Sequence, residues 1–266
     1  MKYITLLLIS ILTQLSLAQE PIYYVNISTN LGNMKIKLYN ETPSHRDNFL
    51  RLVGKKHFDG TLFYRVVKGF VIQGGSSDSR NAAQGRAIGY GKAINIDSEF
   101  SKECYHKRGA ICAPRQPEDV NHFKMSDISQ FYIVQGRKYK LEELTNIEKA
   151  TNNPIKKELK QQFYIPHKEE LARLKTENPK EFNKLLRQIK DKINFHYSIS
   201  DKKEFTESQK QDYINIGGTP ELDGDYTVFG EVVEGLNVLN KIAALEVDRA
   251  SRPHTDVKIK VTVVKL

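Results

Sequence analysis

"FYRVVKGFVIQGG", residues 63–75, places a basic residue, Arg65, within an apolar run that is typical of β-strands and that ends in an amide and two glycines. Lys68 and Gly69 stand where this run must turn. A two-residue turn of the favoured type requires positive φ at both positions, which lysine resists. A three-residue loop, residues 68–70, avoids the conflict, so the stretch predicts a β-hairpin with that loop.

The register of this hairpin decides which side chains meet. It predicts that Val67 lies opposite Val71 and that Arg65 lies opposite Gln73, on one face of the pair. A lone arginine on a strand usually points to water. Here the two phenylalanines of the same stretch bring apolar side chains close to it, which favours a fixed guanidinium beside an apolar pocket.

The rest of the chain predicts many short strands and few helices. Residues 23–39 alternate apolar and polar side chains around a turn signal, which predicts a second hairpin. Thr42 and Pro43 mark the start of a helix that ends near Gly54, and residues 74–98 are expected to form a long loop. Further elements are expected as strands at 108–113, 129–136, 226–233 and 256–266, and as a helix at 234–245. This pattern predicts a mainly β fold, a closed antiparallel β-barrel capped by two helices.

Residues 137–214 differ in kind from the remainder. Apolar residues recur at helical spacing in three groups, and Pro154, Pro166 and Pro179 are expected to separate three helices. The region holds 18 Lys or Arg and 13 Asp or Glu, a net +5 of the whole chain's +9. Because this charge is spread without a dense basic run or interleaved aromatics, a solvated helical insertion is favoured over a nucleic-acid-binding surface.

The first eighteen residues have the pattern of a secretory signal peptide. An early lysine precedes a short apolar stretch and the small-x-small sequence Ser16-Leu17-Ala18. The apolar stretch is shorter than the ~20 residues that span a bilayer. We therefore expect export to the periplasm or the exterior, without stable membrane insertion after cleavage. The two cysteines, Cys104 and Cys112, could pair there or remain buried thiols, and the sequence leaves both open.

The hairpin that carries Arg65 is similar to a segment of a known protein family, and two further segments of the chain are similar to that family as well. "SQFYIV", residues 129–134, and "LDGDYTVFGEVVEG", residues 222–235, follow it in the order found in cyclophilins. The chain therefore resembles the cyclophilin family of peptidyl-prolyl cis-trans isomerases over residues 22–136 and 215–266, with 137–214 inserted. The resemblance implies a cyclophilin-like β-barrel, an isomerase acting on unfolded or proline-containing polypeptides, and no cofactor or metal. It implies nothing about oligomeric state.

The resemblance also implies a role for each matched residue. Arg65 takes the place of the catalytic arginine, and Gln73 that of its hydrogen-bonding neighbour. The substrate-binding positions implied are Phe70, Val71, Tyr132 and Leu222 around the proline ring, Gln130 and the main chain near Pro114 and Arg115 along the peptide, and Tyr226 where a histidine is frequent. Departures from the family pattern are Tyr64 in place of a histidine, Glu221 in place of a tryptophan and Ile128 in place of a glycine, and the missing tryptophan predicts weak binding of cyclosporin.

The residue types suit the chemistry of prolyl isomerisation. Resonance opposes rotation of the Xaa-Pro bond by ~18–20 kcal/mol, and the proline nitrogen regains its lone pair only in the twisted transition state. A donor aimed at that nitrogen therefore binds the transition state better than the planar peptide. An alternative from another class stays open, namely a proline-peptide binding chaperone on the same barrel with little isomerase activity.

Overall fold

The computed structural model describes residues 21–264, so the predicted signal peptide lies outside the described residues. Eight antiparallel pairings join the described strands into one large and one small sheet. The strands are β1 (Tyr23–Thr29), β2 (Gly32–Leu38), β3 (Phe63–Val66), β4 (Val71–Gly74), β5 (Asn95–Ile96), β6 (Ala110–Cys112), β7 (Ser126–Asp127), β8 (Phe131–Val134), β9 (Val228–Glu234) and β10 (Lys260–Val264). The helices are α1 (Pro43–Gly54), α2 (Leu141–Phe163), α3 (Lys168–Glu177), α4 (Pro179–Ser198), α5 (Glu207–Asn215) and α6 (Leu236–Ala243), with short 3-10 turns η1 (Ser77–Ser79), η2 (Ile165–His167) and η3 (Pro220–Leu222).

The large sheet has eight strands in the order β10-β1-β2-β9-β6-β8-β4-β3. The predicted first hairpin is confirmed, since Tyr23 pairs with Leu38 and Thr29 with Gly32. Strands β6 and β9 come from distant parts of the chain, yet they lie side by side at the centre of the sheet. The central position of β6, β8 and β9 brings the chain segments at their ends to one side of the molecule, where the site lies.

The sheet is curled and open, which corrects the expected closed barrel. Strands β3 and β10 are its two edges and do not pair along their lengths. Residues at and before the starts of the two edges are linked instead, through a bridge between Leu62 and Lys258 and backbone hydrogen bonds from Phe63 N to Val257 O (3.0 Å), from Gly60 N to Ile259 O (2.8 Å) and from Ile259 N to Thr61 O (2.7 Å). A closed barrel requires a continuous ladder between the edge strands, and β3 and β10 themselves are not paired.

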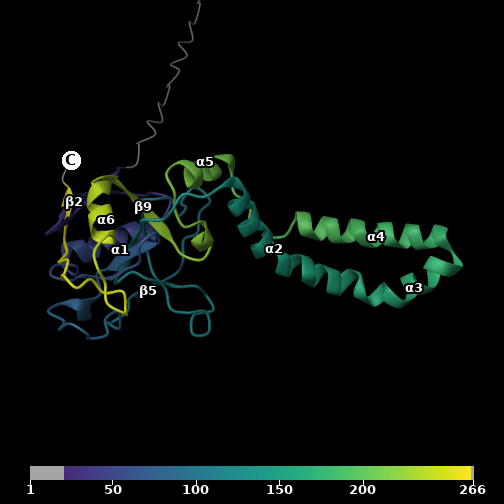
Figure 1. Ribbon diagram of the computed structural model, residues 1–266, viewed down its shortest axis with the longest axis horizontal. Coiled ribbons are helices and arrows are strands. Elements are labelled where there is room, and N and C mark those ends of the chain that lie inside the picture. Colours follow the sequence, from purple (N-terminus) through teal and green to yellow (C-terminus); the bar gives the residue numbers. More distant parts are fainter. Residues whose placement is uncertain (1–20, 265–266) are drawn as a thin grey trace, which may run out of the picture.

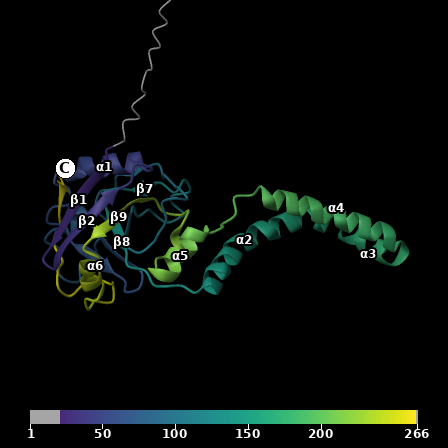
Figure 2. The same cartoon turned by 90° about the horizontal axis from the view of Figure 1, so that it is seen from above.

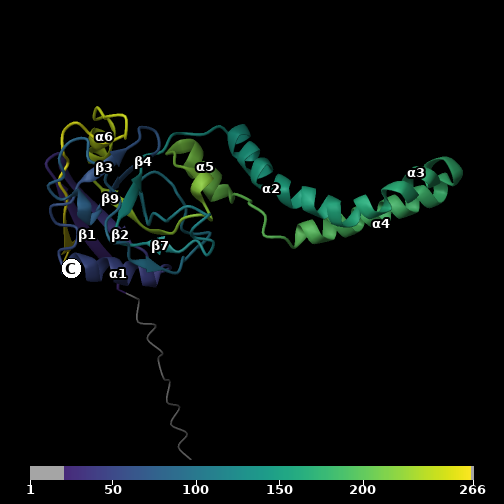
Figure 3. The ribbon, with the colours of Figure 1, turned by 90° about the horizontal axis from the view of Figure 1, so that it is seen from below.

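Aromatic side chains fill the core beneath the sheet. Phe49 of α1 packs against Phe58, with ring centroids 5.0 Å apart, and against Phe229 of β9 at 5.2 Å. Phe131 of β8 lies edge-on to Phe58 at 5.4 Å. Such aromatic pairs contribute ~0.5–1.5 kcal/mol each beyond their buried area. Helices α1 and α6 cover opposite ends of the curled sheet (Figure 3), as the two capping helices of the prediction require.

Three helices form a long projection that we call the helical arm, residues 141–198 (Figure 1). Helix α2 runs outward and α4 returns beside it, with α3 at the far end. The expectation that Pro154 separates two helices is wrong, because it lies inside α2. Pro154 is exposed on a helix that curves along its length (Figure 2), and a proline in a long helix can be accommodated by such bending at the cost of one backbone hydrogen bond. Pro166 and Pro179 do stand at the boundaries between helices.

Helix α5 is an element that the sequence analysis missed. Its first turn is held by a capping box, in which Thr206 and Gln209 exchange side-chain to backbone hydrogen bonds. Tyr213 of α5 is fully buried against the body of the protein. None of the helices within residues 21–264 is both long and apolar enough to cross a membrane.

Both cysteines are free and buried, so the disulfide that the sequence left open is not formed in this structure. They belong to one small apolar cluster beneath the site. Burial raises the pKa of the Cys104 thiol to about 11, which keeps that thiol protonated at neutral pH.

Candidate active site

The β3–β4 hairpin has the predicted register. Arg65 pairs with Gln73, and the backbone N–H of Val67 donates to Val71 O at 2.9 Å. Gly69 has φ of 75°, which a residue with a side chain rarely adopts, and its N–H donates to the side chain of Gln135 at 2.6 Å. The loop is thereby attached to the end of β8, and this fixes the position of the arginine strand relative to the rest of the site.

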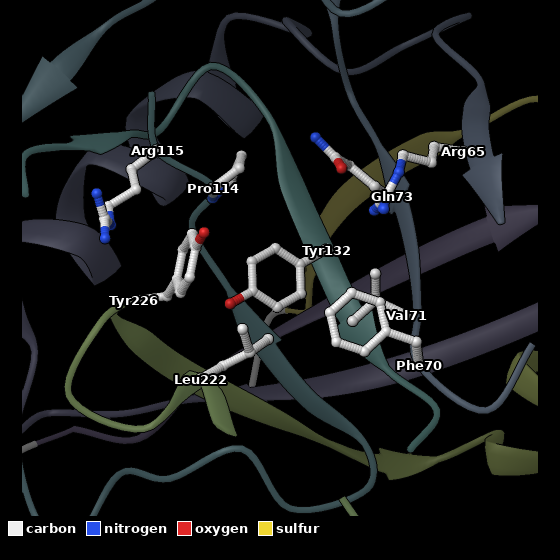
Figure 4. A pocket seen from close by; sticks show the side chains of 9 residues that line it. All are labelled: Arg65, Phe70, Val71, Gln73, Pro114, Arg115, Tyr132, Leu222 and Tyr226. Atoms are coloured by element: carbon white, nitrogen blue, oxygen red, sulfur yellow. The ribbon is translucent and has the colours of Figure 1, made fainter. Parts of the chain in front are cut away.

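A pocket of about 200 Å³ lies beside this hairpin (Figure 4). The structure brings nine of the ten sequence-predicted site residues to its wall: Arg65, Phe70, Val71, Gln73, Pro114, Arg115, Tyr132, Leu222 and Tyr226. The guanidinium of Arg65 lies near Gln73 at one side, and Pro114 and Arg115 lie at the opposite side. Apolar and aromatic side chains occupy the space between these polar sides, so the pocket suits a compact apolar group next to a peptide.

Arg65 projects to this pocket from the middle of β3 and is half-buried. Among residues 21–264, no hydrogen bond or ion pair engages its guanidinium, in contrast to Arg80, Arg108, Arg115 and Arg252, which donate to protein oxygens. A guanidinium stays protonated at every relevant pH. Its N–H donors are therefore available to a bound ligand.

Gln73 has a different partner from the one implied by the resemblance. No hydrogen bond joins it to Arg65 within the described chain; instead its Nε2 donates to the hydroxyl of Tyr64 at 2.7 Å. That hydroxyl in turn donates to Oε1 of Gln130. Burial raises the pKa of Tyr64, with a further rise from Asp78, so the phenol remains a donor at neutral pH. Tyr64, flagged only as a departure from the family pattern, thus holds the amide beside Arg65 in place.

Gln130 does not line the pocket. Its Nε2 donates to Oδ2 of Asp127 at 3.0 Å, and the other oxygen of that carboxylate accepts from Ser129 N at 2.9 Å and Ile94 N at 3.1 Å. The side chain is 5% exposed and lies behind Tyr64. The structure therefore places Gln130 as a buried support of the hairpin.

Tyr132 of β8 has a hydroxyl that is hydrogen-bonded within the protein. The hydroxyl lies 2.9 Å from Nε2 of His106, whose Nδ1 lies 2.8 Å from Oδ1 of Asp223. The other oxygen of Asp223 accepts from the hydroxyl of Tyr213 in α5 at 2.5 Å. Burial raises the pKa of Tyr132 well above its ordinary value, so the phenol stays neutral. Sequence reasoning missed His106 and Asp223, because their pairing joins segments 117 residues apart.

The wall next to Tyr226 is held by charged groups. Arg115 donates through Nε to the backbone oxygen of Asp225 at 2.7 Å, and Nζ of Lys124 lies 2.5 Å from the carboxylate of the same residue. The guanidinium of Arg115 also lies over the ring of Tyr226, 5.0 Å from its centroid. Glu221, which stands in place of the family tryptophan, accepts from the hydroxyl of Tyr139 at 2.8 Å and does not line the pocket.

The fold and the pocket together define a class of protein. In this class a curled antiparallel sheet carries an apolar pocket, and a guanidinium without a protein partner among the described residues lies at the side of that pocket. A family model described as cyclophilin type peptidyl-prolyl cis-trans isomerase/CLD matches residues 24–151 and 145–264. The chain belongs to this family, whose members are enzymes that isomerise peptidyl-prolyl bonds.

Two relatives of the chain have peptidyl-prolyl cis-trans isomerase in their names. It is 29% identical over 240 residues to a protein of Streptococcus pyogenes serotype M6 provisionally named a bifunctional phosphatase/peptidyl-prolyl cis-trans isomerase, covering 89% of this chain and 37% of that protein. It is 32% identical over 124 residues to peptidyl-prolyl cis-trans isomerase CYP18-1 of Arabidopsis thaliana, covering 46% of this chain and 72% of that protein. The chain thus spans well under half the length of the streptococcal relative.

A solved structure supports the fold. The cyclophilin type peptidyl-prolyl cis-trans isomerase of Cryptosporidium parvum matches 92% of this chain and 99% of its own chain with a TM-score of 0.52 and 19% sequence identity. At that identity the likeness concerns the fold, and the roles of individual residues depend on the geometry described above.

Proposed function

We propose that this chain accelerates rotation about Xaa-Pro bonds, with Arg65 as the group that donates to the proline nitrogen in the twisted transition state. The observation that carries the proposal is the unengaged guanidinium at the side of an apolar pocket of about 200 Å³. Phe70, Val71 and Leu222 offer the proline ring an apolar surface. Gln73, fixed by Tyr64, lies on the same face as Arg65 and is placed to hold the peptide main chain.

The catalytic effect is one of differential binding. In the planar peptide the proline nitrogen shares its lone pair with the carbonyl and accepts no hydrogen bond, whereas in the twisted form the lone pair is localised. One well-placed donor in a partly desolvated site contributes ~3 kcal/mol, or roughly a hundredfold in rate. The apolar wall adds to this, because the less polar twisted amide loses less on leaving water than the planar amide does.

The proposed substrates are proline-containing segments of unfolded polypeptides. The Cryptosporidium parvum protein that this chain resembles has also been solved in the presence of the dipeptide Ala-Pro, with a TM-score of 0.51. The pocket is open to solvent, so a short stretch of flexible polypeptide can enter it. The substrate does not have to be folded in order to bind. These features favour assistance to protein folding as the biological role.

We also propose that the chain is exported through its N-terminal signal and acts in the periplasm or outside the cell. The support is the charged start, the short apolar stretch and the small-x-small site near residue 18. A mature N-terminus at Gln19, found by mass spectrometry of protein recovered from the non-cytoplasmic fraction, is expected. An intact Met1 on protein from the cytoplasmic fraction would contradict this proposal.

We further propose that residues 137–214 are an insertion into the family fold. The two ends of the segment meet, because Arg137 N donates to Gly218 O at 3.2 Å and Gly218 N donates to Arg137 O at 3.0 Å. Strands β8 and β9 both pair with β6, so the sheet is complete without the helices. A variant in which a short glycine-serine linker replaces the helical arm is expected to fold, as judged by cooperative urea unfolding.

The experiment that tests the catalytic proposal compares prolyl isomerisation by the wild type and by Arg65→Ala, using a short peptide with one Xaa-Pro bond. We expect kcat/KM to fall roughly a hundredfold, as the loss of one donor implies. Lys68→Ala is the matched control, since it removes an exposed cation from the loop of the same hairpin. Equal rates for the wild type and Arg65→Ala would favour the alternative, a proline-peptide binding chaperone.

A further inference from the structure

A second cavity, of about 450 Å³, lies between the body of the protein and the base of the helical arm. Its walls come from three chain segments, residues 100–102 with 104–105, 201–205 and 223–226, and from Lys124, Thr151 of α2 and Gln209 of α5. It is more than twice the volume of the prolyl pocket. We call it the arm groove.

The arm groove has walls that are fixed by hydrogen bonds. Asn152 of α2 exchanges two with Lys203, from Nδ2 to the backbone oxygen at 2.9 Å and from the backbone N–H to Oδ1 at 2.8 Å. Phe205 N donates to Glu148 of α2 at 2.7 Å. Gln209 of α5 donates to the backbone oxygen of Lys102 on the facing wall at 3.0 Å. The segment that leaves the arm is therefore attached to α2, and α5 is attached to the body, so the hollow between them is a built feature.

The arm groove adjoins the prolyl pocket. Tyr226 lines both cavities, and the loop that supplies Leu222 to the pocket supplies Asp223, Gly224 and Asp225 to the groove. The shared wall is held by Arg115, which lines the pocket, and by Lys124, which lines the groove; both bind Asp225. A polypeptide with a proline in the pocket can thus continue past Tyr226 into the groove. An extended chain covers ~3.3–3.6 Å per residue, so a few residues beyond the proline suffice to enter it.

The groove offers both apolar surface and hydrogen-bond donors. Phe100 is 43% exposed on one wall and Tyr105 is half-buried beside it, while Phe205 borders the groove with only 6% of its surface exposed. The ammonium of Lys203 donates to the backbone oxygens of Pro220 at 2.6 Å and Asp223 at 3.2 Å, and no carboxylate within residues 21–264 forms an ion pair with it. An ammonium has three N–H groups, so one has no protein acceptor among the described residues; the ammonium also lies over the ring of Phe205, 5.3 Å from its centroid. Burial lowers the pKa of Lys203, as expected for a cation held away from water.

We propose that the arm groove is an extended subsite that binds the part of the substrate polypeptide adjoining the prolyl residue, through its aromatic walls and the free donor of Lys203. This inference rests on the proposed isomerase function, since it assigns to the same enzyme a preference for long, unfolded chains. The proposed insertion, residues 137–214, thereby contributes to substrate binding, because Thr151, residues 201–205 and Gln209 all belong to it.

The test uses three peptides with the same central Xaa-Pro bond: a tetrapeptide, the tetrapeptide with six residues added before it, and the tetrapeptide with six residues added after it. Thr151→Trp places a bulky ring in the groove at an exposed helical position. Thr176→Trp is the matched control, at an exposed position of α3 that does not line either cavity. Phe100→Ala on the opposite wall is a second variant.

We expect the wild type to have a lower KM for at least one extended peptide than for the tetrapeptide. Thr151→Trp and Phe100→Ala should each raise that KM by about tenfold, equivalent to the loss of ~1.4 kcal/mol of binding free energy. Their KM for the tetrapeptide should equal that of the wild type, and Thr176→Trp should have the wild-type KM for every peptide. If neither groove variant alters the KM of either extended peptide, the subsite is refuted. Failure of the isomerase function itself would look different, because the tetrapeptide would then be turned over equally well by the wild type and by Arg65→Ala.

Discussion

Replacing Tyr132 with phenylalanine is expected to destabilise the protein while leaving catalysis intact. The hydroxyl of Tyr132 lies 2.9 Å from Nε2 of His106, and His106 is fully buried. Removal of the hydroxyl leaves this nitrogen without a partner, because its other ring nitrogen already engages Asp223. Leaving a buried polar group unsatisfied costs ~1–3 kcal/mol, so we expect a loss of about 2 kcal/mol in the free energy of unfolding.

Tyr226→Phe provides the matched control. Both tyrosines line the pocket, and their rings lie edge-on with centroids 6.0 Å apart. Within the described chain the hydroxyl of Tyr132 is hydrogen-bonded and no protein group is bonded to that of Tyr226. Removal of the Tyr226 hydroxyl is therefore expected to change the free energy of unfolding by less than ~0.5 kcal/mol.

The assay is urea-induced unfolding at neutral pH, combined with kcat/KM on a short prolyl peptide. For a chain of this size a loss of 2 kcal/mol lowers Tm by roughly 4–8 °C, which thermal scans resolve. The kcat/KM of Tyr132→Phe should equal or slightly exceed that of the wild type, because phenylalanine makes the pocket less polar. Equal unfolding free energies for the two variants would refute the assignment of the Tyr132–His106 hydrogen bond as a structural contact.

Three further predictions concern Tyr64, the His45–Glu99 pair and Glu221. Tyr64→Phe removes the hydroxyl that joins the pocket amide of Gln73 to the buried amide of Gln130, and we expect a severalfold rise in KM with little change in kcat; an unchanged KM would contradict it. Burial lowers the pKa of His45 below 6.5, and hydrogen bonds lower that of Glu99 despite its desolvation, so the unfolded chain binds protons more readily than the folded chain as pH falls below 6.5. The urea midpoint should therefore decrease on acidification from pH 7, and His45→Gln should flatten that decrease; identical slopes would count against it. Because Glu221 turns to another partner and no tryptophan borders the pocket, cyclosporin should inhibit weakly and Glu221→Trp should strengthen inhibition; tight binding to the wild type would show the reasoning to be wrong.

Local signals in the sequence were sufficient for the elements that carry Arg65. The turn at Lys68 and Gly69 limits the loop to three residues, and the loop length sets the pairing of Arg65 with Gln73. The first hairpin, α1 and α6 were likewise predictable, because each combines a clear periodicity with a terminal signal. In these cases the decisive interactions lie within about ten residues of one another.

Contacts between distant segments could not be read from the same patterns. The Tyr64 hydroxyl joins residues 9 and 66 positions away, and the resemblance directed attention to Arg65 as the partner of Gln73. His106 and Asp223 meet across 117 residues. The expected closed barrel and the expected break at Pro154 were wrong for a related reason. Closure of the sheet depends on the pairing of its two edge strands, and the continuity of α2 through Pro154 depends on bending of the whole helix, and neither is visible in the local sequence.

The most direct test of the central claim separates binding from catalysis at Arg65. Peptide affinity is measured by titration with a capped Ala-Pro peptide, and the rate of exchange between its cis and trans forms on the enzyme is measured by NMR line shapes. If the guanidinium acts on the twisted bond, Arg65→Ala should change Kd less than about threefold while the exchange rate on the enzyme falls roughly a hundredfold. A loss that appears wholly in Kd, with the exchange rate of the bound peptide unchanged, would contradict the account.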